Sequence, residues 1–280
     1  MLENSFIHLP GIGAGTEEKL WARGLHTWNH LTENLREVFS AAKAAQVGEA
    51  LEHGRLAYEA REFSYFQGRF KGAEMWRVLP ALLESECIDQ IAYLDIETTG
   101  LGFPPQCKST TIAVYYQNQL HIEHTYNRKR ELMREIDREA KCLVTFNGST
   151  FDLPFLRREF NFDLRQAHVD LRFWMAKHGL KGGLKAIQKS LSEVRQRDSM
   201  DIDGFDAVRL WNMHQRGVPN ALETLMTYNA EDTVVLEQMI YIGLNLERAA
   251  RPHLKLKKFE APTPPPIPHE ICPLVYQMLR

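Results

Sequence analysis

The sequence has no long hydrophobic run. Nowhere in its 280 residues is there a window of the roughly 18 to 20 uninterrupted apolar residues that a membrane-spanning helix needs. Its start, MLENSFIHLPG, also lacks the basic stretch and apolar run of a secretory signal. We therefore expect a soluble protein with no membrane partner.

Cysteine is scarce. The four cysteines, Cys87, Cys107, Cys142 and Cys272, are scattered and form no C-x-x-C pair. This pattern argues against a disulfide framework or a zinc cluster and suits a reducing compartment. We expect a cytoplasmic location.

An excess of charge of either sign is missing as well. Lysine and arginine number 34 against 36 aspartates and glutamates, which gives a net charge of −2. This balance does not exclude nucleic-acid binding, because metal ions and a local groove can meet the phosphates.

Several catalytic signatures are also absent. The sequence contains no P-loop, G-x-S-x-G or H-E-x-x-H motif, so NTPase, serine-hydrolase and zincin mechanisms have no support. The acidic stretch DSMDIDGFD is interpreted as a solvated loop, since its glycine comes too early for a calcium loop and no glutamate closes it.

The patterns that are present divide the chain into four regions, with enough length for one substantial domain and a smaller appendage. Residues 1–50 have the pattern of a small helical module with a Gly-Ile-Gly turn, and residues 51–88 that of a helical connector. Residues 89–248 indicate an α/β domain. Residues 249–280 form a basic and proline-rich tail, which we expect to be extended; linker, partner ligand and disordered segment remain open interpretations.

The α/β domain contains both segments with the residue pattern of strands and segments with that of helices. The apolar, β-branched runs IAYLDIE, TTIAVYY, LHIEHTY and CLVTF predict strands, and the short links between the first three predict an antiparallel meander. The segments KRELMREIDREA, LPFLRREF and AEDTVVLEQMIYIGLNLERA predict helices between and after them.

Two carboxylates stand at the end of the first predicted strand. Asp95 and Glu97 occur in LDIETTGL, and residues two apart on a strand share one face, while Ile96 points into the core. Like charges so close are costly unless a cation lies between them, and such oxygen ligands suit Mg²⁺ or Mn²⁺. A solvated strand end is the structural alternative.

Two later segments add further polar groups. In FNGSTFDLPFL, Asp152 falls in the opening turn of a predicted helix, where a capping role is the alternative. In YNAEDTVVLEQM, Tyr228 and Asp232 are four residues apart and therefore share a helix face. Alternatively, Tyr228 is a core-edge residue and Asp232 a solvated one.

The ordered combination LDIETTGL, NGSTFDLPFL and YNAED resembles the three motifs of the DnaQ-like (DEDD) 3′–5′ exonucleases. The third motif has a tyrosine four residues before its aspartate, and in this it resembles the DEDDy subgroup. The segments WRVLP, HVDLRFW, LKGGLKAIQKSL and DGFDAVRLW resemble the YprB-like, ribonuclease H-like domain group, and the resemblance covers about residues 60–245. It implies an α/β fold, a ribonuclease H-like mixed sheet flanked by helices, that hydrolyses single-stranded nucleic acid from 3′ ends.

The resemblance also implies roles for five residues. Asp95, Glu97, Asp152 and Asp232 would hold two divalent cations, Mg²⁺ or Mn²⁺, with Asp95 bridging both. Tyr228 would orient the attacking water, because an unperturbed pKa of about 10 makes tyrosine a poor base at neutral pH. In the YprB-like group a histidine often stands at this place, so the tyrosine is a departure.

Three residues match positions near the substrate. Thr98, through its backbone amide, and Leu101, as an apolar wedge, correspond to contacts with the terminal nucleotide in related exonucleases. Asn147 is expected to face the site. The alternatives are a tight turn after Thr98, a semi-buried position for Leu101, and a side chain of Asn147 that only braces its loop.

Three other polar residues lie near the motifs. Asp170 is expected to be structural. Arg172 and Lys185 could contact phosphates, although solvation at the surface is the commoner fate of such side chains.

The N-terminal segment LPGIGAGTEEKLWARG resembles a helix-hairpin-helix motif. Gly11 and Gly13 would let backbone amides approach a phosphate, with Lys19 nearby and the positive end of a helix behind them. Glu17 and Glu18 follow the glycines and would repel phosphate. A structural or protein-docking module is therefore the alternative.

Two rival functions share these features. One is a ribonuclease H-like endonuclease that uses the same metals. The other is a catalytically silent nucleic-acid-binding scaffold whose proline-rich tail recruits a protein partner. The intact set of four carboxylates speaks against the scaffold, because a scaffold has no physical need to concentrate acids.

Overall fold

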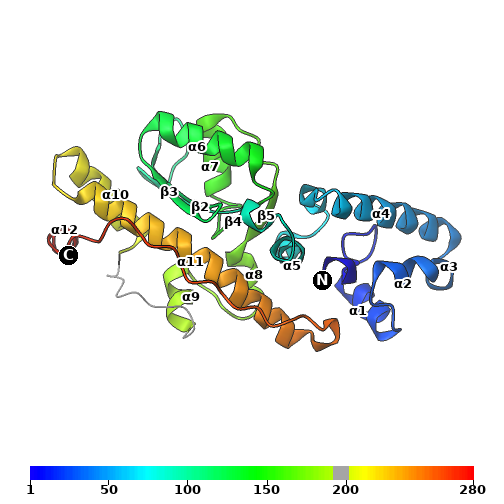
Figure 1. Cartoon of the computed structure of the whole chain (residues 1–280). Coiled ribbons are helices and arrows are strands. Elements are labelled where there is room, and N and C mark those ends of the chain that lie inside the picture. The colour runs from blue at the N-terminus through cyan, green and yellow to red at the C-terminus, as the bar shows by residue number, and fades with distance from the viewer. Residues whose placement is uncertain (192–201) are drawn as a thin grey trace.

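The computed structural model describes residues 1–191 and 202–280 (Figure 1). At its centre lies a five-stranded sheet with the order β3-β2-β1-β4-β5. The first three strands form an antiparallel meander, and β4 and β5 run parallel to β1. The strands are β1 (Ile91–Thr98), β2 (Ser109–Tyr116), β3 (Gln119–Glu123), β4 (Cys142–Thr145) and β5 (Ala167–Asp170). The predicted meander and the predicted mixed α/β sheet are confirmed, whereas β5 was not expected.

The sheet is covered on both faces by helices (Figure 1). On one face lie α6 (Tyr126–Glu139) and α7 (Asp152–Phe160), and on the other α8 (Leu171–Lys177) and the long helix α11 (Ala221–Ala250). Gly243 permits the close approach of α11 to α8, because a Cβ atom there would stand 2.6 Å from Trp174 and Met175.

Alternation along β1 sorts its side chains between the two faces. Leu94 and Ile96 pack with α6 and α7, whereas Ile91 and Tyr93 belong to the apolar cluster on the α11 side. The period of two therefore points the residues at 95 and 97 toward α11. The predicted inward direction of Ile96 is confirmed.

Between α8 and α11 the chain forms α9 (Leu184–Ser190) and α10 (Gly204–Gln215), and α10 packs against α11. Asp203 caps α10 by accepting bonds from Phe205 N and Asp206 N at 2.8 and 2.9 Å. The first part of the predicted DSMDIDGFD loop lies outside the described residues.

The N-terminal helices lie at one end of the molecule, beside the connector (Figure 1). They are α1 (Ala14–Ala22), α2 (Trp28–Glu33), α3 (Leu35–Val38) and α4 (Ala41–Glu59), and α5 (Leu79–Leu83) leads to the sheet. Short 3₁₀ turns complete this part of the chain: η1 (Leu2–Asn4), η2 (Phe63–Phe66), η3 (Gly72–Val78) and η4 (Ile88–Gln90). Residue 50 falls inside α4, and the proposed division of the chain into four regions stays a prediction.

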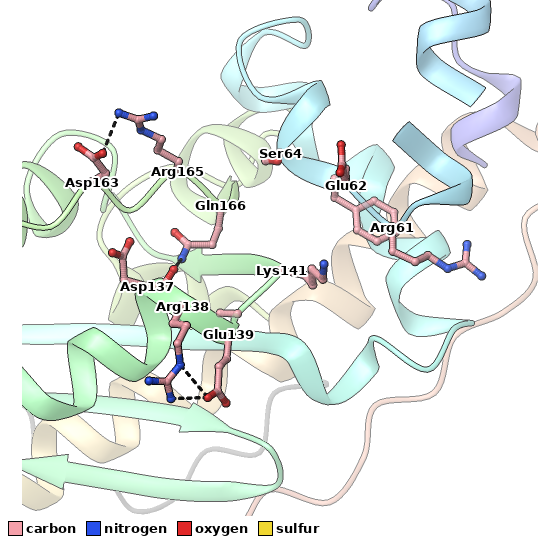
Figure 2. Close-up of a pocket in the computed structure, with 12 residues that line it drawn as sticks. Arg61, Glu62, Ser64, Asp137, Arg138, Glu139, Lys141, Asp163, Arg165 and Gln166 are labelled. Atoms are coloured by element: carbon pink, nitrogen blue, oxygen red, sulfur yellow. Dashed lines mark hydrogen bonds and ion pairs between the residues drawn. The ribbon is translucent and has the colours of Figure 1, made fainter. Parts of the chain in front are cut away.

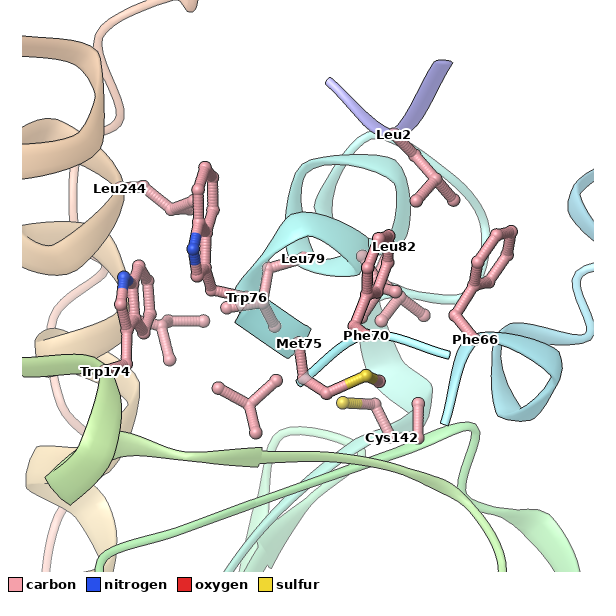
Figure 3. Close-up of a cluster of buried hydrophobic side chains, with 14 of the residues drawn as sticks. Leu2, Phe66, Phe70, Met75, Trp76, Leu79, Leu82, Cys142, Trp174 and Leu244 are labelled. Carbon is pink, nitrogen blue, oxygen red and sulfur yellow. The ribbon is translucent and has the colours of Figure 1, made fainter. Parts of the chain in front are cut away.

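One apolar cluster joins the N-terminal helices to the sheet (Figure 3). Trp76 of η3 stacks on Trp174 of α8, with ring centroids 5.7 Å apart and planes at 6°. Labelled members of the cluster run from Leu2 through Phe66, Phe70, Met75, Leu79 and Leu82 to Cys142 and Leu244. The N-terminal module is thus packed as part of the same core.

A buried ion pair lies in the same region. Arg77 binds Glu17 through two bonds, Nη1 to Oε1 at 3.0 Å and Nη2 to Oε2 at 2.9 Å, and both side chains are at most 2% exposed. Glu17 also accepts a bond from Phe6 N at 2.6 Å. The expectation that Glu17 repels phosphate is wrong, because the guanidinium of Arg77 covers it; Glu18 remains exposed.

The C-terminal tail is extended and runs back along α11 (Figure 1). After η5 (Pro252–Leu254), Phe259 exchanges two backbone bonds with the Asn245 side chain, at 2.8 and 3.0 Å. Cys272 N then donates to Thr224 Oγ1 at 3.1 Å, before α12 (Pro273–Leu279) packs on α10. A protein partner for the tail stays a prediction. No helix in the described part of the chain is long and apolar enough to cross a membrane.

The buried pair generates a stability prediction. Glu17→Gln should lower the free energy of unfolding by about 1–3 kcal/mol, because the buried Arg77 loses the two-bond contact with the Glu17 carboxylate and keeps only one carboxylate contact, with Glu74 at 2.8 Å. Urea denaturation measures the change. Glu131→Gln, at an exposed pair with Arg128, is the matched control and should have a far smaller effect. Equal effects of the two substitutions would contradict the structural role of the buried pair.

Candidate active site

The row of β1 side chains that faces α11 begins with apolar residues and ends with the two carboxylates. Asp95 is partly exposed and accepts a bond from Asn229 Nδ2 of α11 at 2.7 Å. Glu97, two residues further, is 9% exposed. The register with β2 shifts between Glu97 and Thr98, where the strand ends and the chain turns away. Strand geometry therefore directs both carboxylates to the same side.

Asp152 reaches this place from the other face of the sheet. It is the first residue of α7, and the N-cap position belongs to Phe151, which makes no side-chain capping bond. The Asp152 carboxylate instead accepts backbone bonds from its own amide and from that of Ile96 in β1. The bond to Ile96 fixes the carboxylate against the strand that carries Asp95 and Glu97.

A tight loop between β4 and α7 sets the position of Asp152. Asn147 has φ +69°, and a Cβ atom at Gly148 would come within 2.2 Å of Thr145, so this turn requires glycine. Asp170 accepts bonds from Asn147 N at 2.8 Å and from Ser149 N at 3.0 Å. This geometry agrees with the structural role expected for Asp170.

Helix α11 brings Asp232 and Tyr228 to the carboxylates of β1. Both side chains are 6% exposed, and Tyr228 hydrogen-bonds the Asp232 carboxylate. Lys185 of α9 forms an ion pair with Asp232, and its ammonium lies 5.1 Å from the centre of the Tyr228 ring. Lys185, expected at the surface, therefore lies within the site.

The four carboxylates perturb one another. Desolvation raises the pKa of Asp95 and Glu97 well above the ordinary value, and the neighbouring acids raise both further, while Lys185 opposes this. Burial also raises the pKa of Asp152, to about 7, and that of Asp232. Concentrated negative charge of this kind is unfavourable in the absence of a cation.

Tyr228 remains protonated at neutral pH. Burial raises its pKa above the ordinary value, and the charges of Asp232, Glu97 and Asp95 raise it further. The phenol can therefore donate or accept a hydrogen bond but cannot act as a base in this environment.

The donor set fits a hard divalent cation. The acidic groups that converge here offer carboxylate oxygens, and oxygen ligands are those that Mg²⁺ and Mn²⁺ prefer. Within residues 1–191 and 202–280, no three acidic, histidine or cysteine side chains already stand as ligands of one ion. To bind a cation, the carboxylates would have to close around it and Lys185 would have to give up its contact with Asp232.

The residues expected near the substrate lie in the adjoining loops. Thr98 is buried, and its hydroxyl donates to Gly100 O at 2.7 Å. Leu101 is 93% exposed, so its semi-buried alternative is wrong. Asn147 Oδ1 accepts bonds from Thr150 Oγ1 at 2.9 Å and Arg172 Nη1 at 2.8 Å, so its side chain braces the loop. Their contact with substrate stays a prediction.

The N-terminal residues expected to bind a phosphate backbone stand apart from these carboxylates, in the helical module (Figure 1). Gly11 has φ +65°, and its carbonyl accepts a bond from Lys43 Nζ at 3.1 Å. Gly13 precedes α1 in extended conformation, and Lys19 is exposed on that helix. Nucleic-acid contact at this place stays a prediction.

A cavity of about 410 Å³ lies elsewhere, at the start of β4 and β5 (Figure 2). Its charges are largely neutralised by pairs: Arg138 with Glu139, and Arg165 with Asp163 at 2.7 Å. Four carboxyl groups with raised pKa values lie together instead at the far end of β1, which makes that end the candidate site; the other raised carboxyl pKa, that of Glu237, belongs to a single acid of α11.

Sequence reasoning missed two members of the site. Asn229 lies three residues before Asp232, and this helical spacing could have indicated that its amide faces the carboxylates. Lys185 comes from a separate helix, and nothing in the local pattern indicated its pairing with Asp232.

Together, the mixed sheet and its carboxylates define a nuclease-like class of fold and site. A family model described as the RNase_H superfamily matches residues 92–242, more than half of the 280 residues. The chain belongs to the RNase H superfamily. Nucleases of this superfamily generally hydrolyse nucleic acid with divalent metals. No curated protein and no solved structure gives a match.

The electrostatics of the site generate a prediction for the metal-free protein. Glu97→Gln should raise the free energy of unfolding in EDTA at pH 8 by about 0.5–2 kcal/mol, the usual gain from a stabilising substitution, because it removes a carboxylate whose ionisation is disfavoured by burial and by the neighbouring acids. Folding raises the pKa of Glu97, so its ionisation destabilises the native state above the unfolded pKa of about 4.3. The gain should grow as pH rises above that value and disappear below it.

Urea denaturation across pH measures the effect, with the exposed Glu86→Gln as control. Mn²⁺ should stabilise the wild-type protein more than the Glu97→Gln variant. If Glu97→Gln is less stable than the wild type at pH 8, the ionised Glu97 carboxylate does not destabilise the folded protein and the prediction is wrong.

Proposed function

We propose that the chain is a 3′–5′ exonuclease that hydrolyses phosphodiester bonds of single-stranded DNA or RNA at two divalent cations. The observation that carries this proposal is the convergence of Asp95, Glu97, Asp152 and Asp232 from β1, α7 and α11. Three of these side chains are at most 9% exposed, and the charges of Asp152 and Asp232 raise the pKa of both Asp95 and Glu97. A cation-binding function gives this arrangement a physical reason.

The four carboxylates would hold Mg²⁺ or Mn²⁺. Bound cations supply an activated water and stabilise the negative charge that builds on the leaving oxygen. Asp152 is held to β1 by the Ile96 amide and Asp95 by the Asn229 amide, so two of the four are oriented before a cation arrives. Such preorganisation reduces the rearrangement that binding requires.

Tyr228 supports the exonuclease assignment through its position and its protonation. Its hydroxyl, already bonded to Asp232, stands where it can orient a water held at the carboxylates. Because the surrounding acids raise its pKa, the phenol aims the nucleophile and leaves removal of the proton to other groups.

Leu101 is the residue best placed to meet a terminal base. Its side chain lies four residues after Glu97 and is almost fully exposed, although exposure of a leucine to water is unfavourable. We assign it the role of an apolar wedge against the last nucleotide, with the Thr98 backbone beside it.

The first test is cleavage of 5′-labelled single-stranded DNA and RNA with Mg²⁺ or Mn²⁺. We expect a ladder that shortens from the 3′ end. Asp95→Ala/Glu97→Ala should slow cleavage by at least about 10²-fold, since the two acids would hold the cations that stabilise the negatively charged transition state. The matched control is Glu84→Ala/Glu86→Ala, a second exposed pair of acids at the same spacing.

Three outcomes would contradict the proposal. Equal cleavage by both double variants would remove the carboxylates from the mechanism. Cutting of a circular or 3′-blocked strand would assign an endonuclease. Intact strands in every metal, with binding retained, would assign a catalytically silent nucleic-acid-binding scaffold.

The role of Tyr228 has its own test. Tyr228→Phe should lower kcat by up to about 100-fold, the cost of a misplaced nucleophile, while the affinity for Mn²⁺ measured by calorimetry stays unchanged. The alkaline side of the pH–rate profile should keep its shape, because Tyr228 does not titrate there. Loss of an alkaline pKa in the variant would instead identify Tyr228 as the base.

A further inference from the structure

A pocket opens beside the end of β1. Thr99, two residues after Glu97, lines it together with Ser109, the residue of β2 that pairs with Thr98. Its other walls come from the start of α6, the later part of α7 and α10, and its volume is about 740 Å³. That volume lies within the range of sites that hold small organic ligands.

Positive charge dominates the lining of this pocket, although the whole chain carries a net charge of −2. Lys129 is buried and donates to Ser109 Oγ at 2.9 Å, which places a cation in the wall. Lys108 and Arg158 are exposed, and no ion pair within the described part of the chain joins either one to a carboxylate. The opposing acid, Glu159, accepts a bond from Ser109 N at 3.1 Å.

Aromatic rings lie among these cations. Tyr126 is 53% exposed at the start of α6, and Trp211 lines the pocket from α10. The guanidinium of Arg158 lies over the ring of Phe103, 4.3 Å from its centre. Cations beside exposed aromatic faces are the combination that binds single strands without reading sequence, through phosphates and stacked bases.

We propose that this pocket binds a nucleotide of the single strand next to the scissile bond, with its phosphate against Lys108 and Arg158 and its base against Trp211 and Tyr126. The identification of this strand as the one being cut rests on the proposed nuclease function. Binding itself does not need the metal, because none of the four acids of the catalytic site lines the pocket.

Trp211 provides an internal probe. The sequence has five tryptophans, and the other four, Trp21, Trp28, Trp76 and Trp174, are at most 6% exposed. Trp211 is partly exposed, so a base that stacks in the pocket should quench its fluorescence selectively.

The experiment measures binding of a 5′-fluorescein-labelled oligothymidylate to the full chain in EDTA by anisotropy. Trp211→Ala should weaken binding roughly 5- to 150-fold, the measured range for loss of one base stack. Each of the substitutions Lys108→Ala and Arg158→Ala should make the slope of log K, the binding constant, against the logarithm of the salt concentration shallower by about 0.7. Arg165→Ala removes another exposed cation, which pairs with Asp163 at the opposite end of the sheet, and should leave both quantities unchanged.

Fluorescence titration with unlabelled oligothymidylate completes the test. Quenching should occur in the wild type and vanish in Trp211→Phe, whose ring can still stack, so its affinity should remain close to the wild-type value. Quenching that persists in Trp211→Phe would overturn the proposal. So would pocket variants that bind as Arg165→Ala does.

The two proposals fail separately. If the pocket variants bind normally while cleavage depends on Asp95 and Glu97, the pocket assignment falls and the nuclease stands. If binding depends on Trp211 while no metal supports cleavage, the nuclease assignment falls and the pocket remains a strand-binding site.

Discussion

Negative charge held at the end of a buried strand is the constraint on which the rest of this molecule depends. The side chains of β1 alternate between two apolar clusters, and its last α11-facing positions carry Asp95 and Glu97. The fold holds them there against their mutual repulsion by burying the central strands and long helix α11 in a continuous core. Among the described residues, Lys185 offsets this charge through its contact with Asp232, and the Asn229 amide also lowers the pKa of Asp95.

The need to hold these acids together also explains why the turn before Asp152 is fixed by hydrogen bonds. Asp152 is effective only if its carboxylate reaches β1, and the turn before it tolerates no side chain at residue 148. Asp170, at the end of β5, ties that turn through two backbone amides. A short strand that contributes little to the sheet therefore positions an acid on the neighbouring helix.

Local periodicity was sufficient to predict what lies within one element. It gave the common face of Asp95 and Glu97, the first-turn position of Asp152, and the shared helix face of Tyr228 and Asp232. Contacts between distant segments could not be predicted in this way. Glu17 looked like a surface acid because Arg77, its buried partner, is 60 residues away. Strand β5 was missed because its four residues, Ala167–Asp170, include a histidine and an aspartate and show no clear apolar run.

The distribution of charge accounts for how a chain without excess positive charge can act on a polyanion. The carboxylates alone repel a phosphate, whereas Lys108, before β2, Lys129, in α6, and Arg158, in α7, can attract one in the pocket beside the end of β1. If both proposals hold, a strand would be held beside the site before any cation is bound, while the carboxylates still repel its scissile phosphate. Divalent cations held by the four carboxylates would offset their negative charge and let that phosphate approach. Cleavage would then depend on the metal, and capture of the strand would not.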